Sequence, residues 1–254
     1  MTPKTHRPAP EIGGLPIRIG CAGWSISAAQ RAQFDEADSG LARYASRLGC
    51  LEINSSFYRP HKPETYARWA DAVPEGFRFS VKLPRTITHY QRLRATAPLL
   101  DGFFEQSAGL GTKLGCVLVQ LPPSLALEPR SANAFFELLR RHWPGFVACE
   151  PRHASWFDTR ANVLLSRHRI ARVGADPALH PGAGQPGGFD GLAYWRWHGT
   201  PRMYYSEYGK ARLHAWLEAL RDVEGNAAEY WVIFDNTAHG HAASDALCLQ
   251  ALVN

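Results

Sequence analysis

Residues 50–84, CLEINSSFYRPHKPETYARWADAVPEGFRFSVKLP, decide the fold of this chain. The segments 50–58 and 77–84 are short and rich in aliphatic and aromatic residues, which is typical of strands. Between them, Tyr66 and Trp69 are three residues apart and fall on one face of a helix. Two strands joined by a helix pair in parallel, because a parallel connection needs a crossover. The stretch therefore predicts a strand–helix–strand unit.

The same alternation continues through the rest of the chain. Strand-like segments recur, with helical patterns in most of the intervals, at residues 17–24, 116–123, 146–153, 170–176, 193–199 and 229–236. Eight such units in 254 residues fit an α/β fold made of a single (β/α)8 TIM-like barrel. An open doubly wound sheet is the alternative, but GCAGWS at 20–25 lacks the Gly-x-Gly-x-x-Gly phosphate motif expected after its first strand.

The segment 177–191, PALHPGAGQPGGFDG, interrupts the pattern. Its density of proline and glycine predicts that the sixth helix is short or replaced by a loop. A long glycine-rich loop at the catalytic end of a barrel fits a lid over the site, and a disordered insertion is the open alternative. Residues 1–16 are expected to form a flexible tail, which leaves 17–254 as one TIM-like barrel domain.

The composition excludes several classes of protein. With 45% hydrophobic and 20% charged residues, the chain is not disordered, collagen-like or a small disulfide scaffold. The net charge of +5 is compatible with an anionic partner but too small to establish nucleic-acid binding. Five cysteines without a Cys-x-x-Cys pair predict free thiols in a reducing cytoplasm. We find no secretory signal and no apolar run long enough for a bilayer, so no membrane association is expected.

Polar side chains gather at the C-terminal ends of the predicted strands. Because side chains alternate between the faces of a strand, Tyr194, Arg196 and His198 share one face and Trp195 and Trp197 the other. The apolar face packs on helices, so the polar face is expected to line the barrel near its C-terminal opening, where barrel enzymes carry their chemistry. The inner-facing set predicted in this way is Glu52, Asn54, Lys82, Gln120, Glu150, Arg152, Asp176, Arg196, His198 and Asn236.

These groups predict a site for a polar and anionic ligand, because burying so many ionisable groups without a use costs on the order of several kcal/mol each. The alternative is that the carboxylates and cations pair with one another and merely shape the opening. The expected catalytic residues are Glu52, Lys82, Glu150, His153 and His198. The expected substrate-binding residues are Trp24, Asn54, Tyr58, Gln120, Arg152, Asp176, Arg196 and Asn236.

Several chemistries are open to the expected catalytic groups. A carboxylate such as Glu150 in a partly dry opening can have its pKa raised toward neutrality, which suits general acid/base catalysis. Lys82 can anchor a phosphate or carboxylate, act as a base or form a Schiff base, and the nearby carboxylates favour anchoring. The spacing of histidines and acidic residues does not match a metal site, so no metal is expected, and the sequence identifies no cofactor.

Several segments together resemble the signature of the YecE-like family, domain of unknown function 72. They are IGCAGWS (19–25), residues 51–89, VLVQLPPS (117–124), EPRHASW (150–156), YWRWHG (194–199) and FDNTAHGHAASDAL (234–247). The resemblance covers the chain after residue 16 and implies a TIM-like barrel without an established reaction. Pro151 and Asp235 depart from the family pattern, in which an aromatic residue and an asparagine are usual.

Three functions remain open at this point. The first is an enzyme, such as a hydrolase, lyase or isomerase, that acts on a phosphorylated or other anionic small molecule by acid/base chemistry. The second is a nucleic-acid-binding or endonuclease-IV-like protein, which the resemblance implies because the family barrel is similar to that of endonuclease-IV-type enzymes. The third is a non-catalytic protein that binds the same anionic ligand. The sequence does not determine the oligomeric state.

Overall fold

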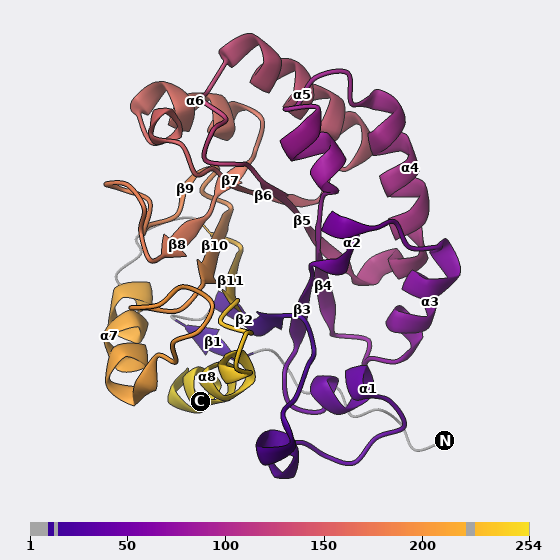
Figure 1. Ribbon diagram of the computed structural model, residues 1–254, viewed down its shortest axis with the longest axis vertical. Coiled ribbons are helices and arrows are strands. Elements are labelled where there is room, and N and C mark those ends of the chain that lie inside the picture. Colours follow the sequence, from indigo (N-terminus) through magenta and orange to yellow (C-terminus); the bar gives the residue numbers. More distant parts are fainter. Residues whose placement is uncertain (1–9, 13–14, 222–226, 254) are drawn as a thin grey trace.

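The computed structural model describes residues 10–12, 15–221 and 227–253. Along these residues, short buried strands alternate with helices (Figure 1). Most strand residues are buried, as expected for a sheet whose two faces are both covered. The strands are β1 (Glu11–Ile12), β2 (Leu15–Ala22), β3 (Cys50–Ile53), β4 (Arg78–Lys82), β5 (Leu114–Gln120), β6 (Phe146–Glu150), β7 (Ala171–Arg172), β8 (Gly174–Asp176), β9 (Gly187–Gly188), β10 (Leu192–Trp197) and β11 (Glu229–Phe234).

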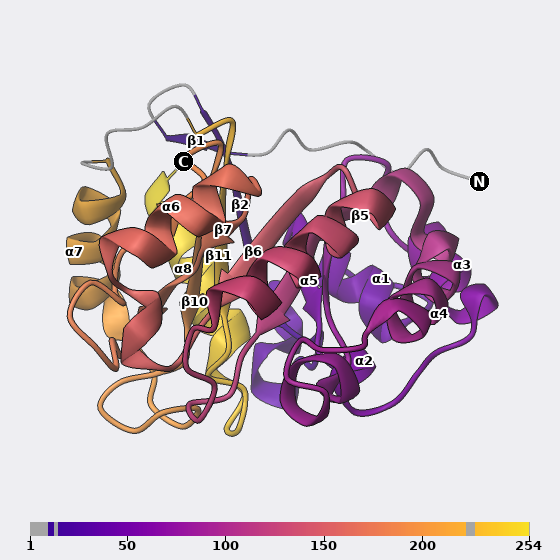
Figure 2. The ribbon, with the colours of Figure 1, turned by 90° about the horizontal axis from the view of Figure 1, so that it is seen from above.

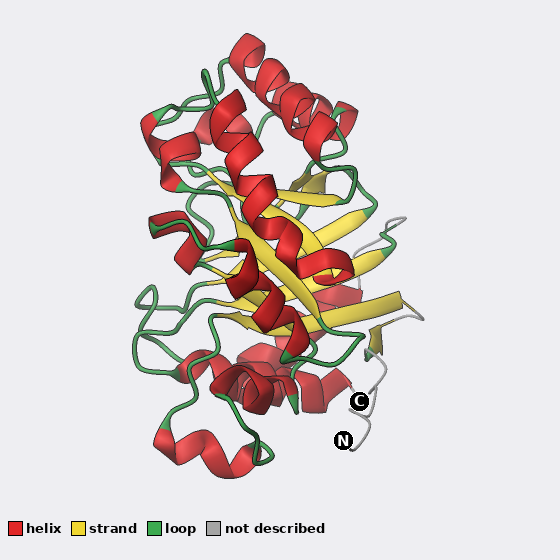
Figure 3. Cartoon of the chain, turned by 90° about the vertical axis from the view of Figure 1, so that its right-hand side faces the viewer, coloured by secondary structure: helices red, strands yellow, loops and turns green. Residues whose placement is uncertain are grey.

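The helices lie around the outside of the sheet (Figure 3). Figure 2 shows the same arrangement from above, with α6 beside β7 and α8 beside β11, which are also in contact. Side chains of Ser39, Glu128 and Asp158 cap the N-termini of α1, α5 and α6. The helices are α1 (Gly40–Ala45), α2 (Ser55–Tyr58), α3 (Pro63–Asp71), α4 (Ala97–Ser107), α5 (Pro129–His142), α6 (Thr159–Arg167), α7 (Gly209–Arg221) and α8 (His241–Val253). A π-helical turn covers Thr86–Tyr90.

The sheet is mostly parallel and nearly closed. Within the described residues its order is β8-β10-β11-β2-β3-β4-β5-β6-β7-β9, and β1 pairs with β2 outside this path. The β1–β2 and β7–β9 pairs are antiparallel. One residue, Val173, separates β7, which pairs with β6, from β8, which pairs with β10. The fold is therefore a barrel-like α/β fold with a mixed sheet, which agrees with the coarse prediction.

Two clusters of apolar side chains hold the sheet in place. The larger cluster fills the space between the sheet and the helices, and the smaller one contains Cys116, Leu118, Tyr194 and Trp231 from the opposite face of the strands. Gly115 makes room for this second cluster, because a Cβ atom at that position would lie 2.9 Å from the Trp231 ring. Apolar packing thus occupies the interior beneath the polar residues at the strand ends.

Three local predictions differ from or are refined by the structure. The strand predicted at 50–58 ends at Ile53, and the chain turns into α2, so Tyr58 is helical. The segment 177–191, which is described throughout, contains no helix but pairs with β7 through β9. Part of the predicted tail 1–16 belongs to the sheet through β1 and the start of β2, while residues 1–9 and 13–14 lie outside the described residues. No helix among the described residues is both long and apolar enough to cross a bilayer.

Candidate functional site

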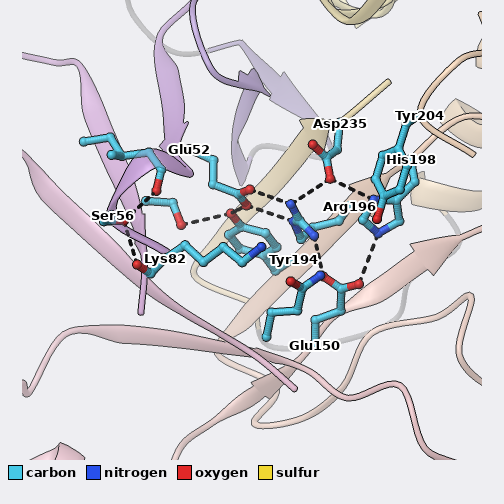
Figure 4. Close-up of polar contacts among 12 residues, drawn as sticks. Glu52, Ser56, Lys82, Glu150, Tyr194, Arg196, His198, Tyr204 and Asp235 are labelled. Carbon is cyan, nitrogen blue, oxygen red and sulfur yellow. Dashed lines mark hydrogen bonds and ion pairs between the residues drawn. The ribbon is translucent and has the colours of Figure 1, made fainter. Parts of the chain in front are cut away.

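Arg196 is the centre of a buried charge network at the C-terminal ends of the strands (Figure 4). It follows the alternation of β10, which turns Tyr194 and Arg196 inward. Its Nε and Nη2 donate to the two carboxylate oxygens of Glu52 at 3.0 and 2.7 Å. The guanidinium also donates to Glu150, and at 3.0 Å to Asp235. One fully buried cation thus joins carboxylates from β3, β6 and the residue after β11.

Neutral and cationic side chains complete the hydrogen bonding of these carboxylates. The Tyr194 hydroxyl donates to Glu52 at 2.9 Å, and its oxygen lies 3.0 Å from Ser80 Oγ. Gln120 Nε2 donates to Glu150 Oε2 at 3.3 Å, and Arg152 Nε donates to Glu150 Oε1 at 3.0 Å. Buried carboxylates with this many donors are fixed in position.

The electrostatics contradict the expectation that Glu150 is a general acid with a raised pKa. Burial alone would raise the pKa of Glu150, but the charges of Arg196 and Arg152 outweigh it and hold the pKa well below its usual range. The pKa of Asp235 is likewise lowered, because the charge of Arg196 and the hydrogen bond and charge of His198 together outweigh burial, which would raise it. Both groups are therefore ionised at neutral pH. The sequence could not show this, since the sign of the shift depends on partners from other strands.

His198 is a cation held between two of these carboxylates. Its Nδ1 lies 2.9 Å from Asp235 Oδ2, and its Nε2 lies 3.1 Å from Glu150 Oε1. An ionised carboxylate can only accept hydrogen bonds, so both ring nitrogens must donate and the ring is an imidazolium. Burial lowers the pKa of His198, but the Glu150 charge and the two hydrogen bonds outweigh this and raise it. His198, which was predicted as a catalytic residue, is therefore not free to accept a proton.

Lys82 is the cation of the site whose ammonium has no hydrogen-bond or ion-pair partner among the described residues. It ends β4 with 6% of its surface exposed, and its ammonium points toward the network in Figure 4. Among the described residues no hydrogen bond or ion pair reaches its Nζ, which lies 4.1 Å from the centre of the Phe57 ring. Burial and the Arg196 charge lower the pKa of Lys82 to about 8, although the nearby carboxylates oppose the shift.

Further polar groups lie beside Lys82 at the opening. The Asn54 Oδ1 atom is buried without a hydrogen-bond partner in the described structure. Asn54 follows Ile53 and Lys82 follows Val81, its strand partner, so the two residues stand at the ends of neighbouring strands. His89 lies on the π-helical turn with its ring centre 5.0 Å from that of Phe57. Burial and the charge of Lys82 lower the pKa of His89, so it is neutral at neutral pH.

A small cavity lies on the other side of the network. Glu150, Arg152 and His198 line it together with residues of the predicted lid, including Pro177, Leu179 and Ala183. Its volume of about 10 Å³ is the size of one water molecule. The loop 177–191 therefore covers this side of the network closely. Whether the loop opens as a lid stays a prediction.

The structure does not bring every predicted site residue into the network. Asp176 and Asn236 were predicted to face inward, and this is wrong. Asp176 instead accepts hydrogen bonds from the Tyr208 hydroxyl and from Arg212 on the outer side of the sheet. The side-chain amide of Asn236 donates to Asp245 of α8. Three other predicted residues also lie outside it: His153 caps the short helix Ala154–Trp156, Trp24 packs edge-on against Trp69, and Tyr58 is 66% exposed on α2.

Sequence reasoning missed two members of the site. Asp235 follows β11 directly and points inward like Trp231 and Ile233, where the prediction had placed Asn236. The run EYWVIFDN is apolar on both faces, so alternation alone could not choose between them. His89 was not predicted as a site residue because it lies beyond the strand end, on a turn whose path the sequence does not reveal.

The kinds of side chain present indicate how this site is organised. Within the described residues, no three His, Cys, Asp or Glu side chains are arranged to hold a metal ion. The carboxylates converge on the Arg196 guanidinium, which takes the central position. The five cysteines are free thiols, and burial raises the pKa of Cys21 to about 12. The available chemistry therefore rests on the cations and acceptors around Lys82.

Comparison with known sequences shows the relationships of the chain. A family described as "Protein of unknown function DUF72" matches residues 18–254. The UPF0759 protein YecE of Escherichia coli (strain K12) is 33% identical over 121 residues, which is 47% of this chain and 43% of YecE, less than half of that relative. The UPF0759 protein YunF of Bacillus subtilis (strain 168) is 22% identical over 94% of this chain and 95% of YunF.

Solved structures share the fold. A DUF72 family protein from Enterococcus faecalis V583 superimposes with a TM-score of 0.78 at 24% identity, over 94% of this chain and 95% of that protein. A DUF72 family protein from Thermotoga maritima MSB8 gives a TM-score of 0.77 at 24% identity, over 93% and 98% of the two chains. The chain therefore belongs to the DUF72 family of proteins of unknown function, as the sequence resemblance predicted.

Proposed function

We propose that this protein is an enzyme that binds an anionic small molecule at the C-terminal opening of its barrel and transfers a proton with Lys82. The observation that carries the proposal is the Lys82 ammonium, which is buried at the opening without a hydrogen-bond or ion-pair partner in the described structure. A buried cation without a counter-charge is costly unless a ligand supplies one.

The charge balance of the site supports an anionic ligand. The described cluster holds one more cation than carboxylate, with Lys82, Arg152, Arg196 and the His198 imidazolium against Glu52, Glu150 and Asp235. Arg152 donates to Glu150 and to the Tyr204 hydroxyl at 3.3 Å, so its position is fixed. A phosphate or carboxylate beside Lys82 would neutralise the excess charge.

Lys82 also has the property required for proton transfer. A group with a pKa of about 8 exists in both protonation states near neutral pH, unlike an ordinary lysine. The charge network around Arg196 provides a fixed electrostatic environment for the Lys82 amine. The network does not accept the Lys82 proton. Catalysis by the carboxylates themselves is therefore not part of the proposal.

The location also supports a functional site. We interpret β7 and β8 as one interrupted strand, so that the sheet corresponds to a (β/α)8-type barrel with the opening at its C-terminal face. In such barrels the active site lies at that face. The free thiols support the expectation of a reducing compartment such as the cytoplasm.

One observation favours nucleic-acid binding as a second candidate. Tyr58 and Tyr90 are 66% and 63% exposed, and Arg85 lies 6.0 and 5.4 Å from their rings. Exposed aromatic rings beside arginine can stack on unpaired bases. This candidate requires binding of a single-stranded oligonucleotide that weakens steeply with salt. A lack of binding at low salt would exclude it.

The main proposal is tested by calorimetric titration with inorganic phosphate and by a turnover screen of phosphorylated and carboxylated small molecules. Lys82→Met is expected to weaken phosphate binding about tenfold or more, because one charge-assisted contact is lost. Lys82→Arg keeps the charge and is expected to bind phosphate but lose turnover. Lys62→Met, at an exposed lysine, is the matched control. Equal phosphate binding by the Met variant and the parent protein would refute the proposal, and binding without any turnover would refute its enzymatic part.

A further inference from the structure

We propose that the Lys82 amine is a nucleophile that forms an imine with the aldehyde or ketone group of an anionic substrate. This inference rests on the proposed function and names the substrate class of the same site. It goes beyond proton transfer because it assigns a covalent bond to Lys82 Nζ.

The surroundings of Lys82 suit an amine that must react in its neutral form. The Phe57 ring covers the ammonium at 4.1 Å, and the Ser56 hydroxyl donates to the Lys82 carbonyl oxygen at 2.7 Å, which fixes the end of β4. Free amines, not ammonium ions, attack carbonyl groups. With a pKa of about 8 instead of 10.5, Lys82 holds roughly two orders of magnitude more neutral amine at neutral pH than an ordinary lysine.

The other described lysines do not share these surroundings. Lys113 Nζ donates to the carbonyl oxygens of Ala70 and Val73 at 2.7 and 2.9 Å. Lys62 and Lys210 are exposed to solvent. Lys82 is therefore the lysine of the described chain that combines burial, an unpaired Nζ and a place at the strand ends.

The reaction is balanced without an oxidant or reductant. The nitrogen lone pair forms a bond to the carbonyl carbon while the carbonyl π electrons move to oxygen, which takes up the proton lost from nitrogen. The resulting carbinolamine loses its oxygen as water after protonation and leaves an iminium. His89, neutral and close to Lys82, is placed to pass the first proton from nitrogen to oxygen and to deliver from solvent the second proton, which leaves with the oxygen as water. Water adds back to release the product.

The charge network favours the iminium. The iminium carries its positive charge at the position that the ammonium occupied. The negative charges of the nearby Glu52, Glu150 and Asp235 therefore stabilise the iminium as they stabilise the ammonium. The unpartnered Asn54 Oδ1 can accept a hydrogen bond from a hydroxyl group of the ligand. Together with the excess cation at the site, these groups fit a hydroxylated carbonyl compound that carries a carboxylate or phosphate.

Reductive trapping tests the inference directly. The full-length protein is incubated with glyoxylate or pyruvate and cyanoborohydride at neutral pH, and labelled lysines are mapped by peptide mass spectrometry. We expect the Lys82 peptide to be modified at least about tenfold faster than the peptides of Lys62 and Lys210, because more of its amine is neutral. Lys62→Met is expected to leave the labelling of Lys82 unchanged. Labelling of Lys82 no faster than that of the exposed lysines would overturn the inference.

A second comparison separates this inference from the proposed function. If phosphate binds to the parent protein and to Lys82→Arg while Lys82 is not labelled, the imine is refuted and the anion site stands. If an uncharged probe, propionaldehyde, labels Lys82 as fast as glyoxylate does and phosphate does not bind, the nucleophile stands and the anion site is refuted. The parent protein alone supplies the labelling result, so the test does not depend on the folding of a variant.

Discussion

Replacing Arg196 by methionine tests the network that surrounds the site. The substitution removes the guanidinium from Glu52, Glu150 and Asp235, which are all buried. Leaving a buried charge without its partner costs about 3–5 kcal/mol. Among the described side chains, Glu52 then keeps the Tyr194 hydroxyl, whereas Glu150 keeps Gln120, Arg152 and His198. We therefore expect the free energy of unfolding at pH 7 to fall by about 4 kcal/mol.

The pH dependence of the variant identifies the cause of this loss. In the parent protein the pKa values of Glu150 and Asp235 are lowered, so their contribution is present above pH 4.5 and is lost as the pH falls through their folded values. Without Arg196, the largest charge that opposes burial is gone, so Glu150 and Asp235 bind protons more readily in the folded state than they do in the parent protein. The variant is therefore expected to become more stable as the pH falls from 7 to 5.

Urea denaturation followed by circular dichroism at pH 7 and pH 5 measures both effects. The double variant with Glu52→Gln removes one of the uncompensated charges and is expected to recover about 1–2 kcal/mol relative to Arg196→Met. A loss below about 1 kcal/mol at pH 7, or a variant that is destabilised further at pH 5, would refute the reasoning that Arg196 compensates buried carboxylates.

Three further predictions follow from single contacts. The raised pKa of His198 means that its contribution is complete below pH 6.5 and is lost as the pH rises through its folded value, so denaturant titrations should show a decline toward alkaline pH that His198→Gln lacks. Tyr194→Phe removes the donor to Glu52 and should cost about 1–3 kcal/mol in thermal unfolding, and an unchanged Tm would contradict this. Gly115→Ala places a Cβ 2.9 Å from the Trp231 ring and should cost about 1–3 kcal/mol, measured by urea denaturation; a neutral effect would show that the interior is loosely packed.

The sequence predicted the parts of the site whose strands have two chemically different faces. In β10, Tyr194 and Arg196 alternate with Trp195 and Trp197, so the inner face was assigned correctly. The same holds for Glu52 in β3, where the neighbouring Leu51 and Ile53 pack toward the helices. The mostly parallel, barrel-like sheet also followed from the regular alternation of strands and helices.

Where the two faces of a strand are chemically alike, the inward-facing side was assigned incorrectly. Ala171, Val173 and Ala175 face inward, whereas the prediction had chosen the opposite register through Asp176. Small and apolar residues occupy both faces there, and nothing in the local pattern distinguishes them. Pairing of the carboxylates with the arginines was one of the alternatives, but the sequence did not show that three carboxylates meet at Arg196, because they come from segments up to 144 positions away.

The most direct test of the central claim is the protonation of Lys82 with and without an anion. In protein labelled with ¹³C at the lysine ε carbons, Lys82→Met identifies the signal of this residue, which is one of five lysines. We predict that the Lys82 signal titrates near pH 8 in the free protein and at higher pH in the presence of phosphate, because a bound anion favours the ammonium. A Lys82 that titrates near pH 10.5 and does not respond to phosphate would contradict the claim that the barrel opening is an anion site built around this amine.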